Sequence, residues 1–148
     1  PTKSESRMLL SHAQVRQWFL WKLDPGSTAY HISGALTLRG ELDVEGLKRS
    51  FDALVVRHES LRTVFRGDDA GQLEQIILNT QTALIEEINL SAVSVAERQI
   101  RVQEATERLL QTVFDLEQGP LLRVGLIRKA SDEYILVVVM HHIISDGR

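Results

Sequence analysis

Three segments of the chain carry apolar residues at the spacing of an amphipathic helix. The first follows Ser11–Gln14, a capping box whose side chains satisfy free backbone amides at a helix start. The second follows Asp43, a residue suited to cap a helix, and its apolar stripe consists of Leu47, Phe51, Leu54 and Val55. A second capping box, Ser94–Glu97, opens the third, which is expected to end near Val113. The pattern therefore predicts three helices.

Other segments have the pattern of β-strands. Residues 30–39 alternate, which predicts a half-buried strand whose inner side consists of Ile32, Gly34, Leu36 and Leu38. Two short strands are expected near residues 62–65 and 73–78, joined by a glycine-containing loop or hairpin. Residues 121–127 follow a Gly-Pro turn, and the uninterrupted apolar run 134–140 predicts a central strand covered on both faces. Without an internal repeat or linker, this mixture indicates an α+β fold with helices packed on a sheet.

Composition excludes several classes of protein. With 43% apolar and 25% charged residues, the 148-residue chain is typical of one globular domain and unlike a disordered or fibrous one. The absence of cysteine excludes disulfides, thiolate metal sites and a cysteine nucleophile. A net charge of −3 with interspersed signs lacks the basic patch of a nucleic-acid partner. The longest apolar run is far shorter than the ~20 residues of a membrane helix. The first residues of the chain do not have the pattern of a signal peptide, so a cytoplasmic location is expected.

The strongest candidates for chemistry are His141, His142, Asp146 and Gly147, which follow the predicted central strand directly. Histidine exchanges protons near neutral pH, and neighbouring residues leaving a strand point to opposite sides. One histidine can therefore face a cleft while the other packs inward. Paired histidines after a strand can equally be structural, hydrogen-bonded residues. A metal site is disfavoured because adjacent side chains rarely converge on one ion.

Arg57 and Arg62 end the second predicted helix. The helix macrodipole alone favours basic residues there. Their guanidinium groups also offer a fork for a carboxylate such as Asp146, which would hold the histidine turn in place without touching substrate. We expect both arginines to be structural.

The remaining patterns carry no chemistry of their own. Trp18, Phe19 and Trp21 form an aromatic stripe, and core packing is the expected role of Trp18 and Phe19. No serine lies in a nucleophile elbow, and no glycine-rich loop resembles a phosphate cradle.

Four segments, in this order along the chain, carry recognisable motifs: Ser11-x-Ala13-Gln14-x-Arg16-x-Trp18-Phe19-Leu20, Arg57-His58-Glu59-x-Leu61-Arg62-Thr63-x-Phe65, Phe114-Asp115-Leu116-x-x-Gly119-Pro120-Leu121-x-Arg123 and Met140-His141-His142-Ile143-Ile144-Ser145-Asp146-Gly147. Together they resemble the condensation domains of nonribosomal peptide synthetases. A lone His-x-x-x-Asp-Gly would be weak, because many acyltransferases share it, whereas four ordered matches are specific. The one departure is Arg148, where this family often has tryptophan, which leaves the subtype and substrate preference open.

The resemblance implies a fold like that of chloramphenicol acetyltransferase, in which two similar lobes surround a tunnel. Residues 1–148 would be the N-terminal lobe, cut at the active-site motif, and the C-terminal lobe would be a missing partner. The implied reaction is attack of an acceptor aminoacyl amine on a donor thioester. Both substrates would be held on phosphopantetheine arms of peptidyl or acyl carrier domains, beside an adjacent adenylation domain. No directly bound cofactor, metal ion or covalent intermediate is implied.

The resemblance also assigns roles within the motif. His142 would face the tunnel and orient the attacking amine or accept its proton, and Gly147 would allow close backbone approach to the developing oxyanion. His141 and Asp146 would be structural, with Arg57 or Arg62 pairing with Asp146. Two alternatives remain open. One is a non-catalytic module that docks carrier domains or a partner lobe, and the other is a related acyltransferase that forms esters.

Overall fold

The computed structural model describes residues 5–8, 12–29, 31–67, 72–78 and 85–144. Three α-helices, seven strands and two 3₁₀ turns, η1 and η2, make up this part of the chain. They follow in the order β1 (Glu5–Met8), α1 (His12–Leu23), β2 (His31–Arg39), α2 (Val44–Arg57), η1 (Glu59–Arg62), β3 (Thr63–Gly67), β4 (Leu73–Leu78), β5 (Ile85–Asn89), α3 (Val95–Gln111), β6 (Leu122–Ala130), β7 (Glu133–His141) and η2 (His142–Ile144).

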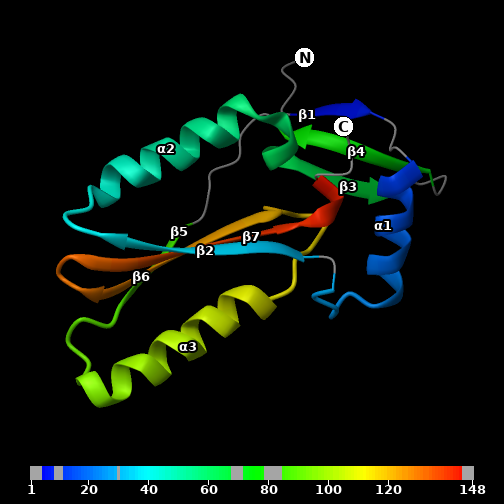
Figure 1. The fold of residues 1–148 in the computed structure, drawn as a ribbon. Helices are drawn as coiled ribbons and strands as arrows, with labels where there is room; N and C mark the ends of the chain where they lie inside the picture. Colours follow the sequence, from blue (N-terminus) through cyan, green and yellow to red (C-terminus); the bar gives the residue numbers. More distant parts are fainter. Residues whose placement is uncertain (1–4, 9–11, 30, 68–71, 79–84, 145–148) are drawn as a thin grey trace.

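The strands form two sheets. The larger has the order β2-β7-β6-β5, and all of its pairings are antiparallel except β5 with β6, which is parallel. Helices α2 and α3 lie on opposite faces of this sheet (Figure 1). The smaller antiparallel sheet has the order β1-β4-β3 and lies beside α1 (Figure 1). This arrangement is the α+β fold that the sequence predicts.

Strand β7 is an inner strand of the larger sheet and is covered on both sides, as predicted. Its residues alternate between two apolar clusters. Val137 and Val139 belong to the cluster that contains Leu109 of α3, whereas Leu136 belongs to the cluster that contains Val55 of α2. A strand buried in this way needs apolar side chains at every position, which explains the uninterrupted run.

Helix starts follow the predicted capping residues. The Asp43 side chain accepts a hydrogen bond from the Gly46 amide at 3.0 Å, and the Ser94 hydroxyl accepts one from the Glu97 amide at 3.4 Å. Each satisfies an amide that the first helical turn leaves without a partner. Ser11 of the first capping box lies outside the described residues. The third helix ends at Gln111, close to the predicted end.

Two burial predictions are wrong. Strand β2 occurs where predicted, but Ile32 and Leu36 on its expected inner side are 39% and 64% exposed. Since β2 is the outer strand of its sheet, within the described chain α2 and α3 cover mainly its neighbours. Phe19 is 58% exposed, because α1 buries the face that carries Trp18 and Gln14, and Phe19 lies about a quarter-turn away from Trp18.

Two strands were not predicted at all. Strand β1 is short and contains mainly polar residues, and β5 carries two consecutive exposed glutamates, Glu86 and Glu87. Both are outer strands of their sheets, where the apolar alternation that marks a strand is weakest.

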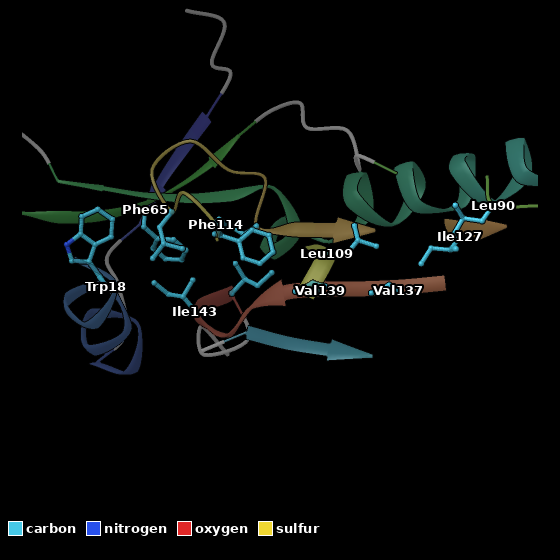
Figure 2. Packing of buried hydrophobic residues seen from close by; sticks show 12 residues of the cluster. Trp18, Phe65, Leu90, Leu109, Phe114, Ile127, Val137, Val139 and Ile143 are labelled. Atoms are coloured by element: carbon cyan, nitrogen blue, oxygen red, sulfur yellow. The ribbon is translucent and has the colours of Figure 1, made fainter. Parts of the chain in front are cut away.

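The larger apolar cluster extends from the four-stranded sheet to α1. Figure 2 shows Trp18, Phe65 and Ile143 gathered at one end of this cluster, with Leu90 and Ile127 at the other. The turn that follows β7 is therefore part of the core rather than a surface loop. Among the described residues, no helix is long and apolar enough to cross a membrane.

Candidate active site at the end of strand β7

The two adjacent histidines have different surroundings. His141 ends β7 and is buried, with 3% of its surface exposed, while His142 begins η2 and is half-buried. The His141 backbone amide donates to the Leu121 carbonyl, and its Nδ1 accepts a hydrogen bond from the Ile143 amide at 3.1 Å. Because Nδ1 accepts, the His141 ring is the neutral tautomer with its hydrogen on Nε2. This bond bends the backbone immediately after β7 into η2.

Helix α1 supports the same turn from the other side. Gln14 is 2% exposed, and its Nε2 donates to the Ile143 carbonyl at 3.5 Å. Trp18 packs in the same cluster as Ile143, and the Trp21 indole N–H donates to the Phe114 carbonyl at 3.1 Å. Gln14 and Trp18, four residues apart on one face of α1, thus reach the histidine turn.

Four side chains pack against one another at the end of β7, and we call them the ring stack: Arg123, Phe114, His31 and His141. The Arg123 guanidinium carbon is 4.3 Å from the Phe114 ring centroid, which is a cation–π contact. The His31 ring meets Phe114 edge to face at 4.9 Å and His141 at 5.9 Å between centroids. The Phe114 and His141 centroids are 6.4 Å apart. All these separations are in the range of favourable aromatic contacts.

The end of α3 anchors the stack at two points. Arg123 Nη1 donates to the Leu109 carbonyl at 2.7 Å, and Nη2 donates to the Val113 carbonyl at 3.3 Å. The His31 Nδ1 lies 3.3 Å from the Leu110 carbonyl. These carbonyls lie in or just after the last turn of α3, where the helix itself leaves them without partners.

Burial shifts the pKa of His31 within the stack. Burial is the main cause that lowers its pKa below the ordinary value, the Arg123 charge adds to the decrease, and the Leu110 carbonyl opposes it. A neutral imidazole can donate through only one nitrogen, so His31 donates from Nδ1 to the Leu110 carbonyl. Burial also lowers the pKa of Arg123, which stays charged at any pH relevant to a cell.

The two candidate arginines differ in their surroundings. Arg57 is exposed at the end of α2. Arg62 is half-buried, and its guanidinium binds three backbone carbonyls: those of Val55 at 3.2 Å, Val56 at 3.4 Å and Leu78 at 2.7 Å. It thereby ties the end of α2 to β4. Its predicted pairing with Asp146 stays a prediction, because Asp146 and Gly147 lie outside the described residues.

Two hollows in the surface have different relations to this site. One of about 280 Å³ lies against the ring stack and is lined in part by Phe114, Pro120 and Arg123. A larger one, about 570 Å³, lies between α3 and the β6–β7 hairpin and contains none of the predicted site residues. Within the described ranges, no three histidine, aspartate or glutamate side chains are grouped as metal ligands.

Comparison with known proteins decides the family. The family model described as "Condensation domain" matches residues 4–148. The chain belongs to the condensation-domain family. It is 38% identical over 138 residues to the chondramide synthase of Chondromyces crocatus, and 37% identical over 147 residues to malpinin synthetase of Mortierella alpina. These matches cover 93% and 99% of this chain but only 4% and 2% of the relative, respectively.

Solved condensation domains have the same fold. The starter condensation domain of rhizomide synthetase RzmA is 25% identical, with a TM-score of 0.82, over 93% of this chain and 33% of that one. The first condensation domain of the calcium-dependent antibiotic synthetase, in complex with a substrate analogue, is 24% identical with a TM-score of 0.78. The predicted fold, α+β and like that of chloramphenicol acetyltransferase, is therefore confirmed.

Sequence reasoning missed several residues around the histidine turn. It gave Gln14 only a capping role, it placed Phe114 and Arg123 in a matching segment without a role, and it did not single out His31. The position of His31 depends on the pairing of β2 with β7, in which His31 is opposite His141. A strand pairing between residues so far apart in the chain has no local signal.

Proposed function

We propose that this chain is part of a domain that forms peptide bonds in nonribosomal peptide synthesis. The observation that supports the proposal best is the family match over residues 4–148, which includes both histidines at the end of a central strand. The chain spans only a few per cent of the length of the synthetases that it matches, so the activity proposed here belongs to a larger assembly.

The proposed reaction needs one proton acceptor. The amine nitrogen of the acceptor aminoacyl group attacks the carbonyl carbon of the donor thioester, a carbon–nitrogen bond forms, and the carbon–sulfur bond breaks. In this scheme His142 orients the amine or accepts its proton, which finally resides on the departing thiol. Gly147 gives backbone access to the oxyanion, while His141 and Asp146 hold the turn, with Arg57 or Arg62 as the partner of Asp146.

Both substrates would reach the site on phosphopantetheine arms of carrier domains, with an adenylation domain as a neighbour. The chain would supply the N-terminal lobe, residues 1–148, and a C-terminal lobe would complete the tunnel. The matched part is 33% of a solved condensation domain, which leaves room for such a lobe. A cytoplasmic location is part of the same proposal. Because positioning and exclusion of water supply much of the rate, the chain alone is expected to be inactive.

The test is peptide formation from two loaded carrier domains by the protein that carries this chain. His142→Ala is expected to lower the rate by about 10²-fold, at the lower end of general-base effects, because an amine already has a lone pair. His142→Gln can orient an amine but cannot accept its proton. Recovery of activity in His142→Gln would assign His142 to orientation, and no recovery would assign it to proton transfer.

The matched control is Thr37→Ala, an exposed change on β2 far from the histidine turn, which should keep full activity. An unchanged rate in His142→Ala would contradict the proposed catalytic role. Peptide formation by the isolated chain that His142→Ala abolishes would contradict the requirement for a second lobe.

A second candidate function is a non-catalytic docking module. The observation that favours it is the exposed apolar surface of β2, with Ile32 and Leu36. The occupant would be the remainder of the condensation domain or a carrier domain, so docking alone would survive His142→Ala and fail in Leu36→Asp. An ester-forming acyltransferase is the third candidate, and the same assay with a hydroxyl acceptor in place of the amine separates it.

A further inference from the structure

His31 lies where three parts of the molecule meet. It begins β2, it pairs with His141 at the end of β7, and its ring nitrogen Nδ1 is 3.3 Å from the Leu110 carbonyl at the end of α3. The rest of β2 is largely exposed, with Leu36 at 64%. The half-buried end of an otherwise largely exposed strand is therefore the part that contacts the histidine turn.

Each contact of His31 restricts a different motion of its ring. The hydrogen bond to Leu110 fixes the rotation of the ring, and Phe114 packs against it edge to face at 4.9 Å. Phe114 is itself held under the Arg123 guanidinium. A ring that is fixed on these sides gives a rigid surface to its remaining neighbour, the His141 ring at 5.9 Å.

The His141 ring in turn controls the turn that carries His142. Its Nδ1 must face the Ile143 amide to accept that hydrogen bond. A rotation of the His141 ring would direct Nδ1 away and release the amide that shapes η2. His142 is the first residue of that turn.

We propose that His31 is a positioning residue that holds the His141 ring in place and thereby fixes the orientation of His142. This inference rests on the proposed function, because positioning matters for a rate only if His142 acts on substrate. His31 does not touch substrate in this scheme. It transmits the rigidity of the α3 end to the histidine turn through one ring contact.

Three variants separate the hydrogen bond of His31 from its ring contacts. His31→Ala removes the hydrogen bond to Leu110 and the ring contacts with Phe114 and His141. His31→Phe keeps a ring against His141 but has no N–H for Leu110. His31→Asn keeps an N–H at the same number of bonds from the backbone, but has no ring. Thr37→Ala, on the exposed middle of β2, is the control.

Two measurements are made on the intact protein that carries this chain. The first is steady-state peptide formation, in which lost positioning lowers kcat and leaves KM unchanged. The second is hydrogen exchange followed by mass spectrometry, which reports the Ile143 amide directly. Residues of the β6–β7 hairpin serve as the internal reference for exchange.

The proposal predicts that His31→Ala lowers kcat about tenfold or more, leaves KM unchanged, and speeds exchange of the Ile143 amide by a similar factor. His31→Phe should recover most of both losses, and His31→Asn should recover less. Unchanged exchange at Ile143 in His31→Ala, or better recovery by His31→Asn than by His31→Phe, would overturn it.

The exchange measurement separates this proposal from the proposed function. If the unmodified protein forms no peptide, the proposed function fails, while Ile143 exchange still tests whether His31 holds the turn. If peptide forms and His142→Ala stops it, but His31→Ala changes neither kcat nor exchange, only the positioning role fails.

Discussion

Replacing Arg62 tests whether this residue acts mainly through the backbone. Its guanidinium reaches three carbonyls that belong to α2 and β4, at 2.7 Å for Leu78, 3.2 Å for Val55 and 3.4 Å for Val56. A hydrogen bond made by a charged donor contributes about 1.5–3 kcal/mol when it is well formed. The short bond to Leu78 has that geometry, and the two longer bonds add less.

We therefore expect Arg62→Ala to lower the free energy of unfolding by about 3 kcal/mol. Arg62→Lys should recover only part of this loss, since one ammonium cannot reach carbonyls on two elements as a planar fork can. The measurement is urea unfolding of the domain that carries the chain, with the change in free energy taken from the midpoint and slope.

The matched control is Arg57→Ala, five residues earlier and exposed. Only its favourable position at the end of α2 is lost, which is worth about 0.3–1 kcal/mol. The reasoning would be refuted if Arg57→Ala destabilised the domain as much as Arg62→Ala. Combining Asp146→Asn with each arginine variant in a double-mutant cycle measures the pairing predicted from the family resemblance. A coupling energy near zero for both arginines would contradict that pairing.

Two further predictions concern packing and pH. A Cβ added at Gly125 would lie 2.9 Å from Leu109 Cδ2 and 3.1 Å from its Cγ, so Gly125→Ala should destabilise by about 1–3 kcal/mol, and Leu109→Ala by about 2–5 kcal/mol. In urea unfolding, the double variant should lose less free energy of unfolding than the two single variants lose together, because the new methyl group occupies space that the Leu109 side chain has left. Additive losses would contradict the close approach of the two residues. The pKa of His31 is lowered in the folded state, so as pH falls below 6.5 the unfolded state binds the proton first and stability decreases until the folded-state pKa is passed. In His31→Asn, the free energy of unfolding should decrease less between pH 8 and about pH 5, because this histidine no longer titrates. If the free energy of unfolding depends on pH identically in both proteins, the pH dependence comes from other groups.

Much of the fold could be predicted because burial leaves a local pattern in the sequence. The apolar run of β7 and the stripe of α2 each correspond to a buried surface in the structure. The strands that were missed, β1 and β5, are outer strands, and exposed positions such as Glu86 and Glu87 need no apolar residue. Strand β2 shows the reverse case. Its alternation predicts a buried side, but the apolar residues Ile32 and Leu36 are exposed.

The site could be predicted only in part because many of its contacts involve backbone atoms. Arg62, Arg123 and His31 all bind carbonyl oxygens at the ends of helices. Any residue supplies such a carbonyl, so the partner of each side chain has no signature in the sequence. The matching segments indicated which residues belong together, but the structure was needed to show that Phe114, Arg123 and His141 meet near the end of α3.

The register of β7 decides which of its two terminal histidines is buried. Side chains alternate along a strand, so a shift of one residue would exchange the places of His141 and His142. In the structure His141 is opposite His31 and its backbone amide binds Leu121 on the β6 side, which sets the register from both neighbours. His31 therefore has two roles at one position. Its backbone fixes which histidine turns inward, and its ring contacts that histidine once it is there. Catalytic assignment of His142 thus depends on an edge strand that carries no catalytic residue in the proposed scheme.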